Sequence, residues 1–189
     1  MIWLALETLS DGVSAAVSAD AGRIFERRAK ARRQDERLVP VLDAALKAAR
    51  TTLKRVEAIA VGTGPGRFTA SRVGVTFANM LADSLGIPVF PVSLLEAFAA
   101  RLARENFPDG RARLGIPAPR EEFYVQEFLW KNSVHKACGA PFWSPSLLGA
   151  RLPERPLRAA AVLEAVRGGA VKPRRAAPLY LKPANYAKK

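Results

Sequence analysis

The stretch that decides the fold reads Gly62-Thr63-Gly64-Pro65-Gly66-Arg67-Phe68-Thr69-Ala70-Ser71-Arg72-Val73-Gly74. It follows the apolar run 58–61 and leads into a long helical pattern, which predicts a strand, a glycine loop and a helix in succession. Such a layout directs backbone N–H groups and the N-terminus of a helix toward an anion. The loop matches neither a Walker phosphate loop nor a dinucleotide fingerprint. The residues alone leave two interpretations open, a phosphate cradle and a structural turn.

The individual residues of this loop support both interpretations. Gly64 and Gly66 permit backbone angles and close approaches that a Cβ would forbid. Pro65 stiffens the turn. Thr69 is placed to cap the helix that follows.

Length and composition limit the class of protein. The chain has 189 residues, 49% of them hydrophobic, which is enough for one compact domain or two small lobes. Cys138 is the single cysteine, so an internal disulfide is excluded and a reducing cytosol is expected. The first residues lack the basic region of a signal peptide, and no apolar run approaches the roughly 20 residues of a membrane-spanning helix. We therefore expect a cytoplasmic protein with no membrane partner.

The formal net charge of +13 raises the question of an RNA partner. The basic residues are spread along the chain, with local clusters at 27–33, 111–113, 172–175 and 188–189. No aromatic residue alternates with these clusters, as a stacking platform for single-stranded RNA would require. Two interpretations stay open: contact with RNA, and a generally basic surface or one that meets an acidic protein.

The spacing of apolar residues predicts a βββαβα unit in the first half of the chain. Its strands are expected at 2–7, 13–18, 22–28, 57–62 and 87–92, and its helices at 35–49, 69–85 and 93–105. The second half predicts strands at 112–117 and 121–130, a helix that starts at 144–146 and a helix over 158–167. The turn at 106–110 separates an N-terminal lobe over 1–106 from a reduced C-terminal lobe over 107–189, which ends in a helix and a tail.

The helices over 35–49 and 69–85 are the candidates for contact with another protein. Both have apolar faces, and the second also has a row of small residues four apart, which permits close approach of another backbone. One face of each helix must cover the protein's own sheet, so a partner would take what remains. The candidate interface residues are Leu38, Leu42, Ala45, Ala70, Gly74, Phe77, Ala78 and Leu81.

Catalytic chemistry has few candidates in this chain. His135 is the single histidine and lies three residues before Cys138, so the two could form a nucleophile pair or half of a metal site. A metal site normally has three or four ligands, and the sequence shows no second cluster, so no metal is predicted. The alternative for both residues is an ordinary position in a strand or turn.

The glycine-loop motif Gly64-Pro65-Gly66-x-Phe68-Thr69-x-x-Arg72-x-Gly74 resembles the signature of the bacterial TsaB (YeaZ) family, the dimerisation subunit in the formation of tRNA threonylcarbamoyladenosine. Three further segments match in the same order along the chain: Leu4-Ala5-Leu6-Glu7-Thr8, the stretch 87–97, and Leu179-Tyr180-Leu181-Lys182-Pro183. The resemblance is dense over 1–100, returns at 160–183 and is thin between them.

The resemblance implies an α/β fold of the actin/Hsp70-like (ASKHA, ribonuclease-H-like) type, with two lobes and a shortened second lobe. In actin-like ATPases an Asp that organises metal and phosphate ends the first strand, and here Glu7 takes that place. Arg67 stands where the family usually has Ser, and Pro117-Ala118-Pro119 replaces an Asp-Ala-Arg stretch, which counts against an intact nucleotide cleft. The candidates for a phosphate or nucleotide loop are Glu7, Thr8, Gly64, Gly66, Arg67 and Thr69.

The function that the resemblance implies is that of a non-catalytic scaffold subunit. It would bind and activate a catalytic threonylcarbamoyltransferase (TsaD-like), which holds the metal, while an ATPase subunit (TsaE-like) drives turnover. The chain alone would bind no cofactor and would form a homodimer. ADP or ATP could sit at the interface of the complex. Contact with tRNA would be indirect or through the basic surface. The alternatives are a basic RNA-binding module and an enzyme, either an actin-like ATPase or a glycoprotease-like protein.

Overall fold

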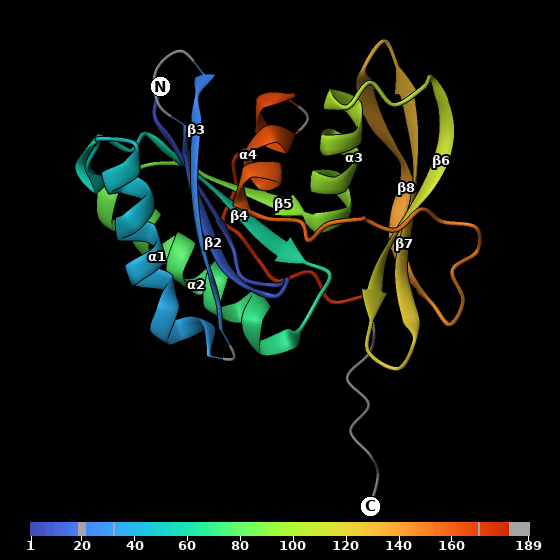
Figure 1. The fold of residues 1–189 in the computed structure, drawn as a ribbon, viewed down its shortest axis with the longest axis horizontal. Helices are drawn as coiled ribbons and strands as arrows, with labels where there is room; N and C mark the ends of the chain where they lie inside the picture. Colours follow the sequence, from blue (N-terminus) through green and yellow to red (C-terminus); the bar gives the residue numbers. More distant parts are fainter. Residues whose placement is uncertain (19–21, 32, 170, 182–189) are drawn as a thin grey trace, which may run out of the picture.

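The computed structural model describes residues 1–18, 22–31, 33–169 and 171–181, and its elements stack in four layers (Figure 1). Helices α1 (Gln34–Ala48) and α2 (Phe68–Leu85) cover one face of a five-stranded sheet. Helices α3 (Leu94–Arg104) and α4 (Ala159–Arg167) lie between this sheet and a second sheet of three strands.

The first sheet has the strand order β3-β2-β1-β4-β5. Strands β1 and β2 and strands β2 and β3 pair antiparallel, whereas β1, β4 and β5 run parallel. The central strands are buried on both faces because helices cover both sides, which explains their nearly continuous apolar sequences. The bounds are β1 (Trp3–Glu7), β2 (Gly12–Ser18), β3 (Ile24–Lys30), β4 (Ala58–Gly64) and β5 (Val89–Ser93).

The second sheet is an antiparallel meander of β6 (Gly110–Ala118), β7 (Glu122–Lys131) and β8 (Val134–Ser144). Its inner face packs against α3 with Phe128 and Trp130, both fully buried in the core that the two sheets share. Helix α3 is therefore buried on two sides and joins the two lobes through one continuous apolar core.

The helices and strands expected in the first half of the chain are all present, with ends shifted by a few residues. A short 3-10 helix, Leu53–Arg55, was not predicted. The helix expected to start at 144–146 is wrong, because the chain there leaves β8 and turns. Strand β8 itself was missed, since Gly139 and Pro141 interrupt its alternation and its outer residues are exposed.

After α4 the chain crosses back over the first sheet as an extended segment, residues 171–181, which we call the C-terminal strap. The amide of Arg174 donates to the carbonyl of Val89 on β5 (2.9 Å), and the amide of Leu179 donates to the carbonyl of Thr63 on β4 (2.8 Å). The sequence predicted the last helix and the tail as part of the second lobe because they follow it in the chain. In space, α4 and the strap both pack against the first sheet and its helices.

The strap is held at its middle by one buried side chain of α2. The amide group of Asn79 donates to the carbonyl of Ala176 (2.9 Å) and accepts from the amide of the same residue (3.0 Å).

No helix in the described ranges combines the length and hydrophobicity needed to cross a bilayer.

We expect Asn79→Ala to lower the free energy of unfolding by about 2 to 4 kcal/mol, because the backbone of Ala176 then loses both partners in a buried position. Urea denaturation measures this change. The matched control is Thr76→Ala on the exposed side of the same helix, which should stay within about 0.5 kcal/mol of the parent. Equal losses in the two variants would show that the strap does not depend on Asn79.

Candidate functional site

The glycine loop joins the carboxyl end of β4 to α2 through a cis Gly64–Pro65 peptide bond. A Cβ on Gly64 would lie 2.8 Å from the carbonyl oxygen of Leu179 in the strap. A Cβ on Gly66 would lie 2.8 Å from the Cδ2 atom of Leu9, in the turn between β1 and β2. The close approaches that these glycines permit are thus made by the protein's own segments.

The start of α2 differs from the prediction by a residue or two, and this changes the role of Thr69. The N-cap residue is Arg67, and its side chain makes no capping hydrogen bond. Thr69 lies in the first turn of the helix and is exposed. The prediction that Thr69 caps the helix is therefore wrong, because the helix begins before it.

Glu7 ends β1 and folds back onto the turn that follows it. One carboxylate oxygen accepts hydrogen bonds from the amides of Leu9 (2.5 Å) and Ser10 (2.9 Å). The hydroxyl of Ser14 donates to the other oxygen (3.5 Å) and accepts from the amide of Ala159, the first residue of α4. The side chain is 2% exposed. Burial raises the pKa of Glu7 to about 7, and the two amide hydrogen bonds oppose this rise.

Thr8 fastens the end of β1 to α2. Its hydroxyl donates to the carbonyl of Ala70 (2.7 Å), and the side chain is fully buried. Gly74 lies next to it, where a Cβ would come within 2.6 Å of the Thr8 hydroxyl oxygen. Thr8 is thus engaged in packing and does not line an open phosphate turn.

A cleft of about 390 Å³ lies between the glycine loop and the second lobe. It is lined on several sides by proline rings, and Tyr124 closes one side. Burial and the nearby carboxylate of Glu122 raise the pKa of Tyr124. Arg67 and Arg155 carry positive charge at the cleft, and Asp11 and Glu154 carry negative charge. The proline residues are Pro65, Pro117, Pro119, Pro153 and Pro156.

Two backbone amides beside this cleft, which could donate to a phosphate group, are engaged within the chain. The amides of Leu9 and Ser10, which follow the first strand, already donate to Glu7. These two bonds use one carboxylate oxygen of Glu7, and the Ser14 hydroxyl donates to the other. Glu7 therefore makes hydrogen bonds within the chain at the position where the resemblance to actin-like ATPases predicted contacts with metal and phosphate.

His135 and Cys138 lie on β8 and have separate neighbours. The Nε2 atom of His135 bonds to a carboxylate oxygen of Glu96 on α3 (2.8 Å), and both side chains are largely buried. The thiol of Cys138 is directed to the carbonyl of Lys136 (3.8 Å). Of the alternatives left open for His135 and Cys138, an ordinary position in a strand is the one observed. Among the described residues, no group of three or more His, Cys, Asp and Glu side chains is placed to hold a metal ion.

Most of the residues predicted for a protein interface lie in the protein's own core. This corrects the prediction for six of the eight, because the inner faces of α1 and α2 pack on the first sheet and its buried side chains. Phe77 and Leu81 are partly exposed. The six buried residues are Leu38, Leu42, Ala45, Ala70, Gly74 and Ala78.

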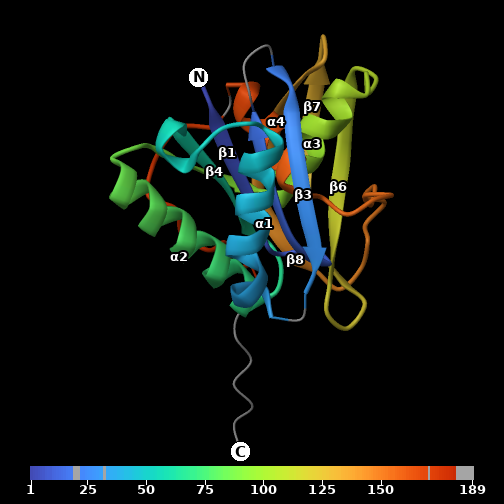
Figure 2. The ribbon, with the colours of Figure 1, turned by 60° about the vertical axis from the view of Figure 1, so that its left-hand side comes forward.

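The outer side of α1 and α2 carries a second set of apolar side chains, which we call the helix patch and define as Val39, Phe68, Met80 and Tyr180 with the half-buried Val73, Phe77 and Leu81. The first four are 56%, 47%, 53% and 45% exposed. Both helices lie on the same face of the five-stranded sheet (Figure 2).

Tyr180 brings the C-terminal strap into the helix patch. Its ring stacks on that of Phe68 with centroids 4.8 Å apart, and its hydroxyl accepts a hydrogen bond from Arg72 (3.1 Å). The guanidinium of Arg72 also lies 3.9 Å from the centroid of the Phe68 ring. The helical spacing of Val73, Phe77 and Leu81 was the available signal for an outer row, while Tyr180 had none because it lies far away in the sequence.

A five-stranded sheet of this order, with helices on both faces and a second sheet after it, defines an α/β protein of the actin-like, ribonuclease-H-like class. The family model described as "tRNA N6-adenosine threonylcarbamoyltransferase" (TsaD) matches residues 27–173. The chain belongs to this family, within its TsaB (YeaZ) branch.

Individual relatives support this placement. The protein named tRNA threonylcarbamoyladenosine biosynthesis protein TsaB from Haemophilus influenzae is 35% identical over 126 residues, which cover 67% of this chain and 53% of the relative. The protein of the same name from Escherichia coli is 30% identical over 125 residues, covering 66% and 54%. The matched region therefore spans about half the length of these relatives.

Among solved structures, YeaZ from Pseudomonas aeruginosa superposes with a TM-score of 0.77 at 27% identity. The superposition covers 95% of this chain and 99% of the other. That the second lobe is shortened relative to the family stays a prediction.

The buried carboxyl of Glu7 gives the protein a specific dependence of stability on pH. Its pKa is about 7 in the folded chain against 4.5 ordinarily, so the folded chain binds the proton more tightly than the unfolded one. Stability is then greatest below about pH 4.5 with respect to this group and falls by about 3 kcal/mol as pH rises to about 7. We expect Glu7→Gln to remove this loss, because the amide oxygen still accepts from Leu9 and Ser10.

Urea denaturation of both proteins between pH 5 and 8 measures the effect. The difference in the free energy of unfolding, variant minus parent, should grow in favour of the variant as pH rises. A difference that stays constant across this range would show that Glu7 is ionised throughout.

Proposed function

We propose that this chain is a non-catalytic subunit in the formation of threonylcarbamoyladenosine in tRNA and that it binds a catalytic threonylcarbamoyltransferase through the helix patch. The helix patch is the observation that carries the proposal. Helix α2 buries its small-residue row under its own sheet and still presents a second apolar row on the outside. An outer apolar row on α2, with Val39 on the neighbouring α1 and Tyr180 of the strap, suits packing against helices of a partner.

The charges around the helix patch support a protein interface. Several exposed charged residues on and beside α1 and α2 form ion pairs within the chain, namely Arg33 with Glu36, Lys47 with Asp43, and Arg175 of the strap with Asp83. Because these residues pair with one another, they place no unpaired charge beside the apolar side chains of the helix patch. Arg72 instead contacts Tyr180 and Phe68 of the patch, and Arg37 forms no ion pair among the described residues. Interfaces have such apolar centres and charged rims.

The role of Glu7 supports a subunit without its own catalytic step. The amides and the carboxylate that would meet metal and phosphate in an actin-like ATPase bind one another here. In the proposed complex the transferase subunit holds the metal and performs the transfer, and an ATPase subunit drives turnover. The alternative of an actin-like ATPase would require ATP hydrolysis by the isolated chain that is lost in Glu7→Ala.

The other expected partners remain part of this proposal. Without the transferase, a second copy of the chain would cover the helix patch and form a homodimer. ADP or ATP would lie at the interface of the complex, and tRNA would be met through the complex or the basic surface. The setting is the cytoplasm.

Co-expression with the transferase of the same organism, followed by size-exclusion chromatography with light scattering, tests the proposal. We expect a one-to-one complex that the double variant Val39→Glu, Met80→Glu weakens at least about tenfold, because two charges are then buried in an apolar contact. Both side chains are more than half exposed in the free chain, so the variant should fold.

The matched control is Phe142→Glu, an exposed apolar residue of β8. Strand β8 belongs to the second sheet, which lies across the molecule from α1 and α2 (Figure 1). This variant should leave the complex intact. Separate elution of the parent proteins at micromolar concentration, with and without nucleotide, would contradict the proposal, as would equal loss of binding in the control. A substitution at Gly74 is unsuitable because it clashes with Thr8 before any partner is met.

A further inference from the structure

A second feature lies away from the helix patch, at helices α3 and α4 between the two sheets. It is a groove of about 1050 Å³, which we call the basic groove. Its walls are the start of β3, the C-terminal ends of α3 and α4, and the turn between β7 and β8. Both sheets and both middle helices contribute, so the groove exists only in the complete fold.

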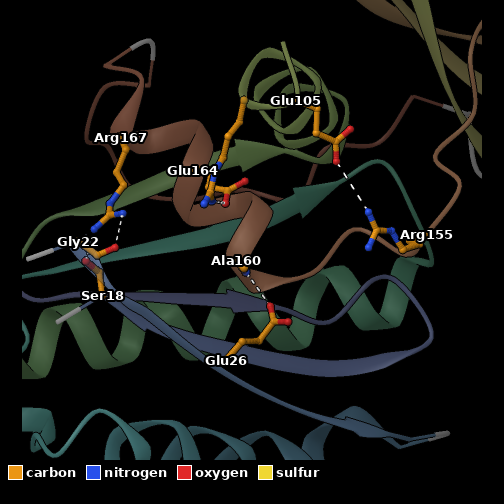
Figure 3. A network of polar contacts seen from close by, with 9 residues as sticks. Ser18, Gly22, Glu26, Glu105, Arg155, Ala160, Glu164 and Arg167 are labelled. Atoms are coloured by element: carbon orange, nitrogen blue, oxygen red, sulfur yellow. Dashed lines mark hydrogen bonds and ion pairs between the residues drawn. The ribbon is translucent and has the colours of Figure 1, made fainter. Parts of the chain in front are cut away.

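Polar contacts hold the walls of the basic groove in place (Figure 3). The guanidinium of Arg167 donates to the hydroxyl of Ser18 (2.5 Å) and the carbonyl of Gly22 (3.1 Å). Glu26 accepts from the amide of Ala160 at the start of α4 (2.8 Å). Glu164 forms an ion pair with Arg104. The groove is thus a built feature whose side chains are ordered by the fold.

The basic groove carries positive charge that the fold does not neutralise. Arg23, Lys136 and Arg167 line it, and in the part of the chain that the structure describes no carboxylate pairs with any of the three. Arg167 is bonded to neutral oxygens, and Arg23 lies over the ring of Phe25. The groove therefore attracts negative charge.

The floor of the groove is apolar. The buried Ala100 and Ala103 and the partly buried Ala160 and Ile24 form it, and the exposed Val134 lies at the rim. Small side chains leave room for larger apolar ones from a ligand. An occupant must therefore present apolar side chains to the floor and negative charge to the rim.

A protein segment meets these conditions better than an RNA strand does. Glu26 and Glu164 line the groove, and two helices end there with the negative ends of their dipoles. An RNA strand carries a phosphate at every nucleotide and would bring some of them close to these negative groups, whereas a peptide can place its few carboxylates only beside Arg23, Lys136 and Arg167. A peptide brings apolar side chains for the floor and N–H groups for helix carbonyls.

We propose that the basic groove binds an acidic, amphipathic segment of a protein partner, with its apolar side chains on the alanine floor and its carboxylates against Arg23, Lys136 and Arg167. The site is separate from the helix patch. It can be filled while a transferase covers α1 and α2, and it does not depend on the function proposed above.

Fluorescence anisotropy with the full chain tests this site. The probe is a short labelled peptide of glutamate and leucine, compared with a lysine–leucine peptide, a glutamate–serine peptide and an oligoadenylate. We expect the glutamate–leucine peptide to bind with the highest affinity. The double variant Arg23→Glu, Lys136→Glu should weaken it about tenfold or more, since attraction at the rim becomes repulsion. Ala160→Tyr, which fills the floor, should also weaken it.

The matched control is Lys54→Glu, Arg55→Glu, which changes the net charge equally at exposed positions outside the groove. It should keep at least most of the parent affinity, and urea denaturation checks that every variant is folded. Three results would overturn the proposal: no binding of the glutamate–leucine peptide at micromolar concentration, equal weakening by the control, or binding of oligoadenylate that alone depends on Arg23 and Lys136. The last result would assign the groove to RNA.

Discussion

The contact between the end of β1 and the middle of α2 is the constraint on which the rest of the molecule depends. Thr8 lies against Gly74 at a distance that leaves no room for a Cβ, and its hydroxyl is bonded to the backbone of Ala70. This close approach uses the small residues of α2 inside the chain. It also places the turn after β1 against the glycine loop, where Leu9 meets Gly66. The inner packing, the shape of the cleft and the outer position of the helix patch all follow from it.

The sequence predicted the first lobe well because its signals are local. Alternation, helical spacing and the glycine loop each act within a few neighbouring residues, and they placed the strands and helices through residue 105. Strand β8 was missed because an edge strand with Gly139 and Pro141 has no regular alternation. Spacing also shows which residues share a helix face, but not what covers that face. The row at Ala70, Gly74 and Ala78 suited a partner and the protein's own sheet equally.

Glu7 illustrates a different limit of sequence reasoning. Its position at the end of the first strand suggested a metal or phosphate site. Its two shortest hydrogen bonds are local and come from the amides of Leu9 and Ser10. A buried carboxyl that accepts from the amides of its own turn stabilises the end of β1. The burial of the carboxyl depends on distant segments, because Ser14 on the next strand donates to it and in turn accepts from Ala159 at the start of α4. No local pattern encodes that outcome, because it depends on how distant segments pack.

The C-terminal strap has a consequence for the order of events during synthesis. It covers the outer edge of the first sheet at Val89 and supplies Tyr180 to a surface otherwise built from residues before 82. A chain still emerging from the ribosome has a bare strand edge and an unfinished α2 surface until residues 171–181 have been made. Bare edges invite pairing with other chains. The nascent chain is therefore most exposed to aggregation in the interval before the strap emerges, and its surface for assembly forms only when the strap has docked.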